Sequence, residues 1–206
     1  QALPSNDSKE KTLLEEWKLS ITPVNDEKEL RQIKRHMGHS ADCFSKAFRV
    51  KNSNRDNAFW NYYDKHNYHK EDIHYWYHGS RNMNCLSILH NGLILNPKAP
   101  KVGHMFGYGI YLAPKAKKSI GYTSLNGSFW VHGTSDKAYL FVMKTVYKSP
   151  YHVYTWTSGM KSLTKSRISP HDAVFAHAGT SLRNDEVVIF DDAQVTLQYI
   201  IELKQQ

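Results

Sequence analysis

Three short segments hold side chains whose types and spacing could perform chemistry on a bound small molecule. His78-Gly79-Ser80 follows a strand-like run, Tyr111 lies in a glycine-punctuated stretch, and Glu186 opens an apolar segment. The histidine offers a directional donor or acceptor, and the adjacent glycine lets a ligand approach the backbone closely. Each segment alone also fits an ordinary role, namely a satisfied polar strand end, a core tyrosine or an exposed carboxylate.

A second group of side chains follows Tyr111 within a few residues. Ser119 and Tyr122 come next along the chain, so that two tyrosines flank a serine. Such a set could hold a flat ring between the tyrosines and hydrogen-bond its polar substituent. The alternative is that both tyrosines are core aromatics, one on a strand and one on a helix.

The elements that must position these residues mix short strands with a few helices in no regular alternation. This pattern is typical of an α+β fold and not of a doubly wound α/β fold. The expected elements are a helix over 27–37, a loop with a short docking helix over 52–70, a strand over 73–77, a helix over 82–90 ended by Asn91-Gly92, a strand over 110–112, a helix over 114–122, and strands over 138–147, 151–155, 186–190 and 193–203.

The composition excludes several classes of protein. Hydrophobic residues make up 40% of the 206 residues, which is enough for a substantial core and too many for a disordered chain. No apolar run reaches the ~18–20 residues of a membrane span, and we expect no membrane association. Cys43 and Cys85 cannot form a disulfide framework or a C-x-x-C zinc site, and we expect no metal and an intracellular location, nuclear or cytoplasmic.

The unusual number is the net charge of +8. An excess of positive charge favours anionic partners such as nucleotides, nucleic acid or acidic proteins, but it also serves solubility. Two groups of cations lie near the motifs: Lys115, Lys117 and Lys118 precede Ser119, and Lys161, Lys165 and Arg167 precede Glu186.

Taken together and in this order, the motifs resemble the catalytic domain of the poly(ADP-ribose) polymerases, the diphtheria-toxin-like ADP-ribosyltransferases. That family carries a His-Tyr-Glu triad, matched here by His78 in Y-H-G-S, Tyr111 in F-G-Y-G-I-Y-L-A and Glu186 in N-D-E-V-V-I-F-D. Further similarity covers the I-L-H-N-G-L run, the K-S-x-x-Y helix over 118–122 and the closing segment 191–203.

The resemblance implies an ADP-ribosyltransferase fold with split antiparallel β-sheets and a few helices around an NAD cleft. It implies NAD+ as co-substrate, cleavage of the nicotinamide–ribose bond, and transfer of ADP-ribose to a protein acceptor or to DNA or RNA. We expect residues 1–16 to be a flexible leader and 17–206 to be the catalytic domain, without the helical regulatory domain of the nuclear polymerases.

The resemblance also assigns residues to the cleft. Glu186, His78 and Tyr111 form the catalytic set, with Glu186 on the 2′-hydroxyl of the nicotinamide ribose and His78 on the adenosine ribose. Gly79 and Ser119 hold the nicotinamide amide, and Tyr122 and Tyr111 enclose its ring. Ser80, Gly103 and His104 complete the expected NAD-binding residues.

Two positions depart from the family pattern. Ile94 stands where the chain-elongating members carry an arginine, so an adenosine-side contact is missing or comes from elsewhere. His104 stands where those enzymes often have another aromatic residue. Two other functions stay open at this level: an inactive module that binds NAD+ or ADP-ribose, and an RNA 2′-phosphotransferase, which lacks this triad.

Overall fold

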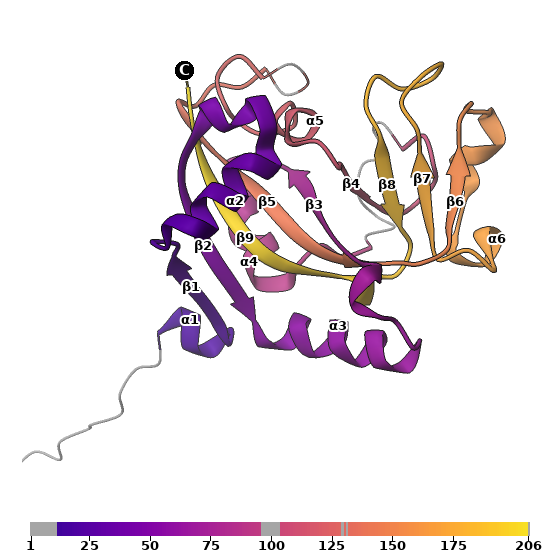
Figure 1. The fold of residues 1–206 in the computed structure, drawn as a ribbon, viewed down its shortest axis with the longest axis horizontal. Helices are drawn as coiled ribbons and strands as arrows, with labels where there is room; N and C mark the ends of the chain where they lie inside the picture. Colours follow the sequence, from indigo (N-terminus) through magenta and orange to yellow (C-terminus); the bar gives the residue numbers. More distant parts are fainter. Residues whose placement is uncertain (1–11, 96–103, 129, 131, 206) are drawn as a thin grey trace, which may run out of the picture.

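Two β-sheets that lie next to each other form the frame of the protein (Figure 1). The computed structural model describes residues 12–95, 104–128, 130 and 132–205. Neighbouring strands are antiparallel except β6 and β7, which are parallel. The expected α+β class, with split and mainly antiparallel sheets, is confirmed.

The first sheet has five strands in the order β1-β2-β9-β5-β3. The bounds of these strands are β1 Leu19–Pro23, β2 Phe44–Asn52, β3 Ile73–Gly79, β5 Lys137–Val146 and β9 Val195–Lys204. Side chains of β5 alternate between two cores, because successive residues of a strand point to opposite faces. Leu140 and Val142 enter one core, and Phe141 and Met143 enter the other.

The second sheet has four strands in the order β4-β8-β7-β6, with bounds β4 Ile110–Leu112, β6 Pro150–Val153, β7 Ala173–Ala176 and β8 Glu186–Ile189. Val187 and Ile189 of β8 pack into the core that they share with the first sheet. Val188 faces the other way, into a smaller core with the fully buried Phe106. The second sheet therefore has one face toward the first sheet and one face of its own.

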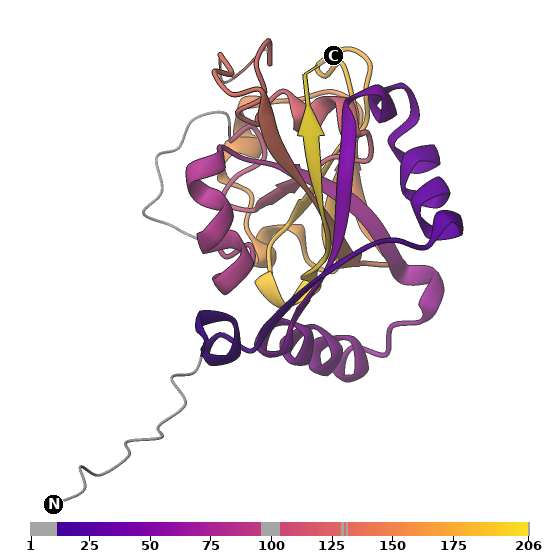
Figure 2. The same ribbon diagram turned by 90° about the vertical axis from the view of Figure 1, so that its left-hand side faces the viewer.

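The helices cover both faces of the first sheet. α2 (Glu27–Met37) and α4 (Cys85–Asn91) lie on opposite faces, and α3 (Ser53–Lys65) runs below the sheet (Figure 2). The shorter helices are α1 Leu13–Glu16, α5 Ala116–Ile120 and α6 Lys165–Ile168, with single 3-10 turns at Gly38–Cys43, Lys70–Asp72, Asn82–Asn84, Ser158–Ser162 and Asp192–Gln194.

Helix α3 is longer than the short helix expected within the loop over 52–70. Asn52 accepts a hydrogen bond from the Arg55 N–H and caps the helix, and Phe59 is fully buried against Tyr68 and Val146. The segment is rich in Asn and Asp, which disfavour helix interiors. Burial of its aromatic residues outweighs that local preference, and the helix continues to Lys65.

Three strands have no counterpart among the expected elements: β1, β2 and β7. In the expected leader, residues 1–11 lie outside the described part of the chain, whereas Leu13–Glu16 form helix α1. Thr12 and Glu15 cap the N-terminus of this helix by two reciprocal hydrogen bonds, an arrangement known as a capping box. The two closing strands, β8 and β9, belong to different sheets.

Candidate active site

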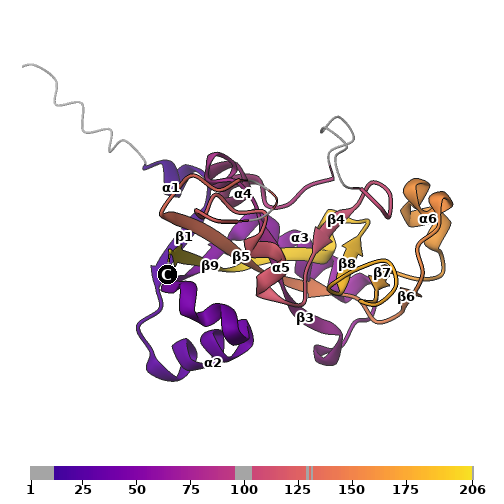
Figure 3. The ribbon, with the colours of Figure 1, turned by 90° about the horizontal axis from the view of Figure 1, so that it is seen from above.

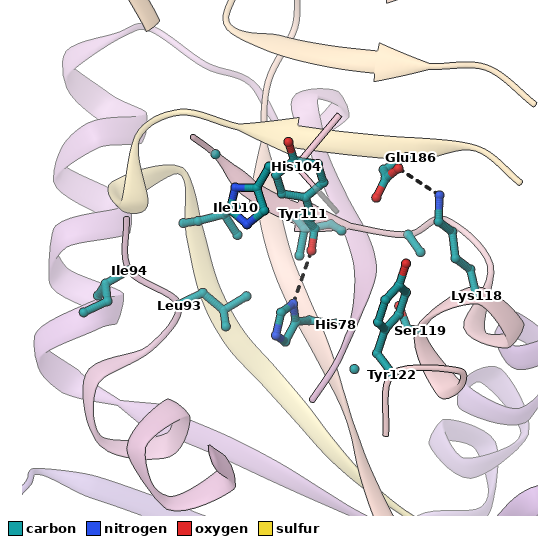
Figure 4. A pocket seen from close by; sticks show the side chains of 14 residues that line it. His78, Leu93, Ile94, His104, Ile110, Tyr111, Lys118, Ser119, Tyr122 and Glu186 are labelled. Atoms are coloured by element: carbon teal, nitrogen blue, oxygen red, sulfur yellow. Dashed lines mark hydrogen bonds and ion pairs between the residues drawn. The ribbon is translucent and has the colours of Figure 1, made fainter. Parts of the chain in front are cut away.

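One cavity of about 280 Å³ collects most of the residues singled out in the sequence (Figure 4). Leu93 and Ile94 lie at one end of the view, Glu186 and Lys118 lie at the other, and His78 lies between them. The cavity therefore has an apolar end and a charged end. Its walls are built by His78, Gly79, Leu93, Ile94, His104, Gly109, Ile110, Tyr111, Leu112, Ala113, Lys118, Ser119, Tyr122 and Glu186.

A backbone bridge between the two sheets brings His78 next to Tyr111. Tyr77 of β3 and Ala113, which follows β4, exchange two backbone hydrogen bonds of 2.9 Å. The Nδ1 atom of His78 then lies 3.2 Å from the carbonyl oxygen of Tyr111. Because a carbonyl can only accept, Nδ1 carries the proton and Nε2 is left as an acceptor for a ligand hydroxyl.

Burial lowers the pKa of His78. A buried imidazole without a carboxylate partner disfavours the charged form. The neutral ring has one donor and one acceptor, which agrees with the hydrogen bond to Tyr111. His78 therefore meets a ligand as a neutral acceptor.

Gly79 lets the end of β3 approach helix α5. A Cβ at this position would lie 1.8 Å from the carbonyl oxygen of Ser119, which is closer than any real contact. Only glycine therefore allows the Gly79 backbone and the buried Ser119 to line the same cavity. The family resemblance assigns both residues to one amide group, and both line this cavity.

The hydroxyl of Tyr111 is used within the protein. It donates to the Gly107 carbonyl over 2.7 Å and accepts from the Phe106 N–H over 3.0 Å. Burial raises its pKa, so the phenol stays protonated. Both bonds hold the ring in place, and Tyr111 therefore offers a ligand the face of its ring.

Glu186 forms an ion pair that the sequence did not predict. Lys118 Nζ lies 2.9 Å from Glu186 Oε2 and also donates to the Asn184 carbonyl over 3.4 Å. Both side chains of the pair are only 13% exposed. The bond uses Oε2, so Oε1 is the oxygen that can accept from a ligand. The sequence marks Lys118 only as one of three lysines near the cleft motif. Its position directly before Ser119 is the feature that could have indicated a place in the site.

The three remaining expected residues differ in their relation to the cavity. His104 lines the cavity, and its buried Nδ1 atom has no hydrogen-bond partner in the described part of the protein. Ser80 is not among the lining residues, and its hydroxyl accepts from Asn84 over 2.9 Å. Gly103 lies outside the described residues.

The three cations before Glu186 differ in their contacts within the protein. Lys165 pairs with Asp191 and lies over the ring of Tyr62. Arg167 donates to the carbonyl and hydroxyl of Ser162. All three cations are exposed, and Lys161 Nζ lies 5.5 Å from the centre of the Trp156 ring.

The described residues contain no group of three or more His, Cys, Asp or Glu arranged to hold a metal ion. Cys43 and Cys85 are both free thiols. No helix in the described ranges combines the length and the apolar character that crossing a bilayer requires.

A split pair of sheets around a cleft that carries histidine, tyrosine and glutamate defines the ADP-ribosyltransferase class of fold. The family model "Poly(ADP-ribose) polymerase catalytic domain" matches residues 26–205. The chain belongs to this family, whose members use NAD+ as co-substrate.

Individual relatives match the chain over only part of their own length. The chain is 31% identical over 147 residues to a Drosophila melanogaster protein named Poly [ADP-ribose] polymerase, covering 62% of the chain and 15% of that relative. It is 31% identical over 153 residues to Poly [ADP-ribose] polymerase 1 of Gallus gallus, covering 62% and 14%. It is 26% identical over 219 residues to Poly [ADP-ribose] polymerase 2 of Arabidopsis thaliana, covering 89% and 33%. The chain thus spans a minor part of each relative's length.

Proposed function

We propose that this chain is an active ADP-ribosyltransferase, which cleaves the nicotinamide–ribose bond of NAD+ and passes ADP-ribose to a protein or nucleic-acid acceptor. The observation that supports it most is the convergence of His78, Tyr111 and Glu186 on one cavity. Members that only bind their ligand have no need of a carboxylate at the reacting carbon. The intact set of three therefore favours an enzyme over a binding module.

The nicotinamide half of NAD+ suits the charged end of the cavity. The Gly79 backbone and the Ser119 hydroxyl would hold the carboxamide, and the rings of Tyr111 and Tyr122 would enclose the pyridinium ring. Burial and the nearby Glu186 carboxylate raise the pKa of Tyr122, which keeps its hydroxyl protonated. Aromatic faces also attract the positive charge of the pyridinium.

The other half of the dinucleotide suits the apolar end. The Nε2 atom of His78 would accept from the adenosine ribose, and Leu93 and Ile94 would contact the adenosine by apolar packing. Ile94 cannot supply the charge of the arginine found in chain-elongating members. His104, with its unpartnered Nδ1, is the polar group available on this wall.

The chemical step needs a negative charge beside the ribose. When the bond between C1′ and the pyridine nitrogen breaks, its electron pair leaves with neutral nicotinamide, and positive charge develops on C1′ and the ring oxygen. Glu186 Oε1 would accept from the 2′-hydroxyl and stabilise that charge. The acceptor then adds to C1′, and its proton passes to the carboxylate or to solvent.

The test is the Glu186→Gln variant with labelled NAD+. The amide keeps the size of the side chain but removes its charge, so we expect kcat to fall by about 100–1,000-fold while an NAD+ analogue binds within about threefold. Release of nicotinamide and transfer of label would both be measured.

Glu202→Gln is the matched control. Glu202 is a carboxylate on β9 with a side chain that is 12% exposed and pairs with Lys137 over 3.8 Å, but it does not line this cavity. It should retain normal turnover. If the parent protein released no nicotinamide with any acceptor, the chain would be a binding module, and full turnover in Glu186→Gln would remove that residue from the mechanism.

A further inference from the structure

A stack of aromatic and histidine rings lies at the outer edge of the second sheet, at the end of strand β6 and just after strands β6 and β7. Tyr154 and His177 stack at 4.4 Å with planes 7° apart, and His152 lies 5.1 Å from His177 at 29°. Tyr154 is 66% exposed, whereas His177 is half-buried behind it. We refer to His152, Tyr154 and His177 as the ring platform.

The sheet holds the ring platform rigidly on one face. His152 pairs with Phe175 in the parallel register of β6 and β7, and residues two positions further along each chain share that face. The half-buried Phe175 lies 4.6 Å from His177 and packs against the main core. A hydrogen bond of 2.8 Å between the rings of His152 and His177 adds a further constraint. A platform fixed in this way loses little conformational entropy when a ligand stacks on it.

The segment of chain that carries the ring platform contains more positive than negative side chains. Residues 148–185 contain five lysines and arginines and three histidines against two aspartates. Both aspartates are engaged within the protein, since Asp172 accepts from Tyr68 over 2.7 Å and Asp185 accepts from the Ala178 N–H over 2.7 Å. The exposed Lys161 and Arg183 therefore face solvent as cations.

Trp156 connects the ring platform with the mouth of the active-site cavity. Its backbone N–H donates over 3.0 Å to the hydroxyl of Ser181, in the loop that leads to Glu186. Its indole N–H donates over 2.7 Å to the carbonyl of Met105, the neighbour of the cavity residue His104. A strand lying on the ring platform and on Lys161 would thus pass beside the cavity.

We propose that the ring platform, with Lys161, binds single-stranded nucleic acid. Exposed aromatic rings that stack on bases, together with cations that meet the phosphates, are the two features by which proteins hold single strands without reading sequence. The bases of a duplex are stacked on each other and cannot reach Tyr154. Use of the bound strand as an acceptor rests on the transferase activity proposed above, but the binding itself does not.

The test is fluorescence anisotropy of labelled 12-nucleotide strands of RNA and DNA, without NAD+. We expect both strands to bind at least about 10-fold more tightly than a duplex of the same length, with affinity falling steeply as salt rises. An oligoglutamate peptide of equal charge serves as a polyanion without bases and should bind far more weakly. Equal binding of the peptide or the duplex would overturn the proposal.

Two variants with matched controls locate the surface. Tyr154→Ala should weaken binding of both strands about 10-fold, whereas Tyr75→Ala, which removes an exposed tyrosine of β3, should not. Lys161→Ala should lower the slope of log K against log salt by about one, whereas Lys28→Ala on α2 should leave it unchanged. α2 and β6 lie at opposite ends of the molecule (Figure 3).

The variants also separate this proposal from the proposed function. Nicotinamide release without added acceptor should be unchanged in Tyr154→Ala, because Tyr154 does not line the cavity. If strands bind to a parent protein that releases no nicotinamide, the surface stands and the enzyme does not. If Tyr154→Ala and Tyr75→Ala bind strands equally well, the surface is wrong whatever the activity.

Discussion

At the scale of single residues, the ion pair with Lys118 restricts the orientation of the Glu186 carboxylate, the group that we propose to be catalytic. A lone glutamate at a strand end can turn in several directions, whereas this one is held on Oε2 by an ammonium group at 2.9 Å. The lysine in turn is anchored by the carbonyl of Asn184. The pair therefore orients Oε1 before any ligand arrives.

Removing the lysine should reduce turnover more than ligand binding. In Lys118→Met the carboxylate loses its orienting partner, and we expect kcat to fall about 10–100-fold with KM for NAD+ within about threefold. Steady-state kinetics of nicotinamide release measure both constants.

Lys117→Met is the control for that variant, because Lys117 is exposed on the same helix and does not line the cavity. It should match the parent in both constants. An equal loss in the two variants would mean that the general charge of α5, and not the pair, matters. A Lys118→Met enzyme of normal kcat would remove the orienting role.

At the scale of elements, the Asn52 side chain connects α3 and α4, two helices between which strand β3 lies in the sequence. Its Oδ1 accepts from Arg55 N–H at the start of α3, and its Nδ2 donates to the carbonyls of Leu89 and His90 at the end of α4. The side chain is fully buried. The end of α4 leads directly into the apolar end of the cavity, so this contact connects packing with the site.

We expect Asn52→Ala to lower the free energy of unfolding by about 2–4 kcal/mol. The change removes a helix cap and leaves two buried carbonyls without their donor. Chemical denaturation measures the loss. Asn61→Ala, on the exposed side of the same helix, should stay within about 0.5 kcal/mol of the parent. Equal stability of the two variants would contradict the bridging role.

Local patterns predicted the strands of mainly apolar or aromatic composition closely, but they missed β1 and β2, whose compositions are more mixed. Strands were expected over 138–147 and 73–77, and β5 and β3 occupy 137–146 and 73–79. Most residues of these two segments are apolar or aromatic, which is typical of strands. β1 and β2 contain Ser, Lys and Arg among their apolar residues, and they become strands by pairing with each other and with β9.

At the scale of the whole molecule, three histidines with lowered pKa values connect stability to pH. Burial lowers the pKa of His36, His74 and His78. In the unfolded chain these groups titrate near about 6.5, so below that pH the unfolded state binds more protons than the folded state. Stability is therefore complete above about pH 6.5 and decreases as the pH falls through the lower values of the folded protein.

Thermal melting between pH 7.5 and 5.5 tests this expectation, and the melting temperature should fall toward the acid side. His74→Phe keeps the stacking on Tyr147, whose ring lies 4.2 Å away, but removes one titrating group. The unfolding free energy of this variant should depend less on pH, because up to one proton fewer is taken up on unfolding. The exposed His39→Asn should follow the parent, and an unchanged slope in His74→Phe would show that His74 is not part of the effect.

The structure also shows which of the cations behind the net charge of +8 are paired with carboxylates. Lys118 and Lys165 pair with the carboxylates of Glu186 and Asp191, whereas the exposed Arg167 donates to the neutral Ser162 and keeps its charge uncompensated by that contact. Lys161 is also exposed, and its Nζ lies over the ring of Trp156, which follows Tyr154 of the ring platform by two residues. The location of the chain in a cell and the identity of its acceptor stay predictions.

The sequence by itself determined the family, the fold class and the identity of the three residues that meet in the cavity. Short motifs carry this information because they combine the residue types that the chemistry of the site needs, at a spacing that can be read directly from the chain. Only the tertiary structure decided the partner of Glu186, the bridge from Tyr77 to Ala113, and the division of β8 and β9 between two sheets. These contacts join residues that are far apart in the chain, and the free energy that selects them comes from burial and pairing across the whole fold.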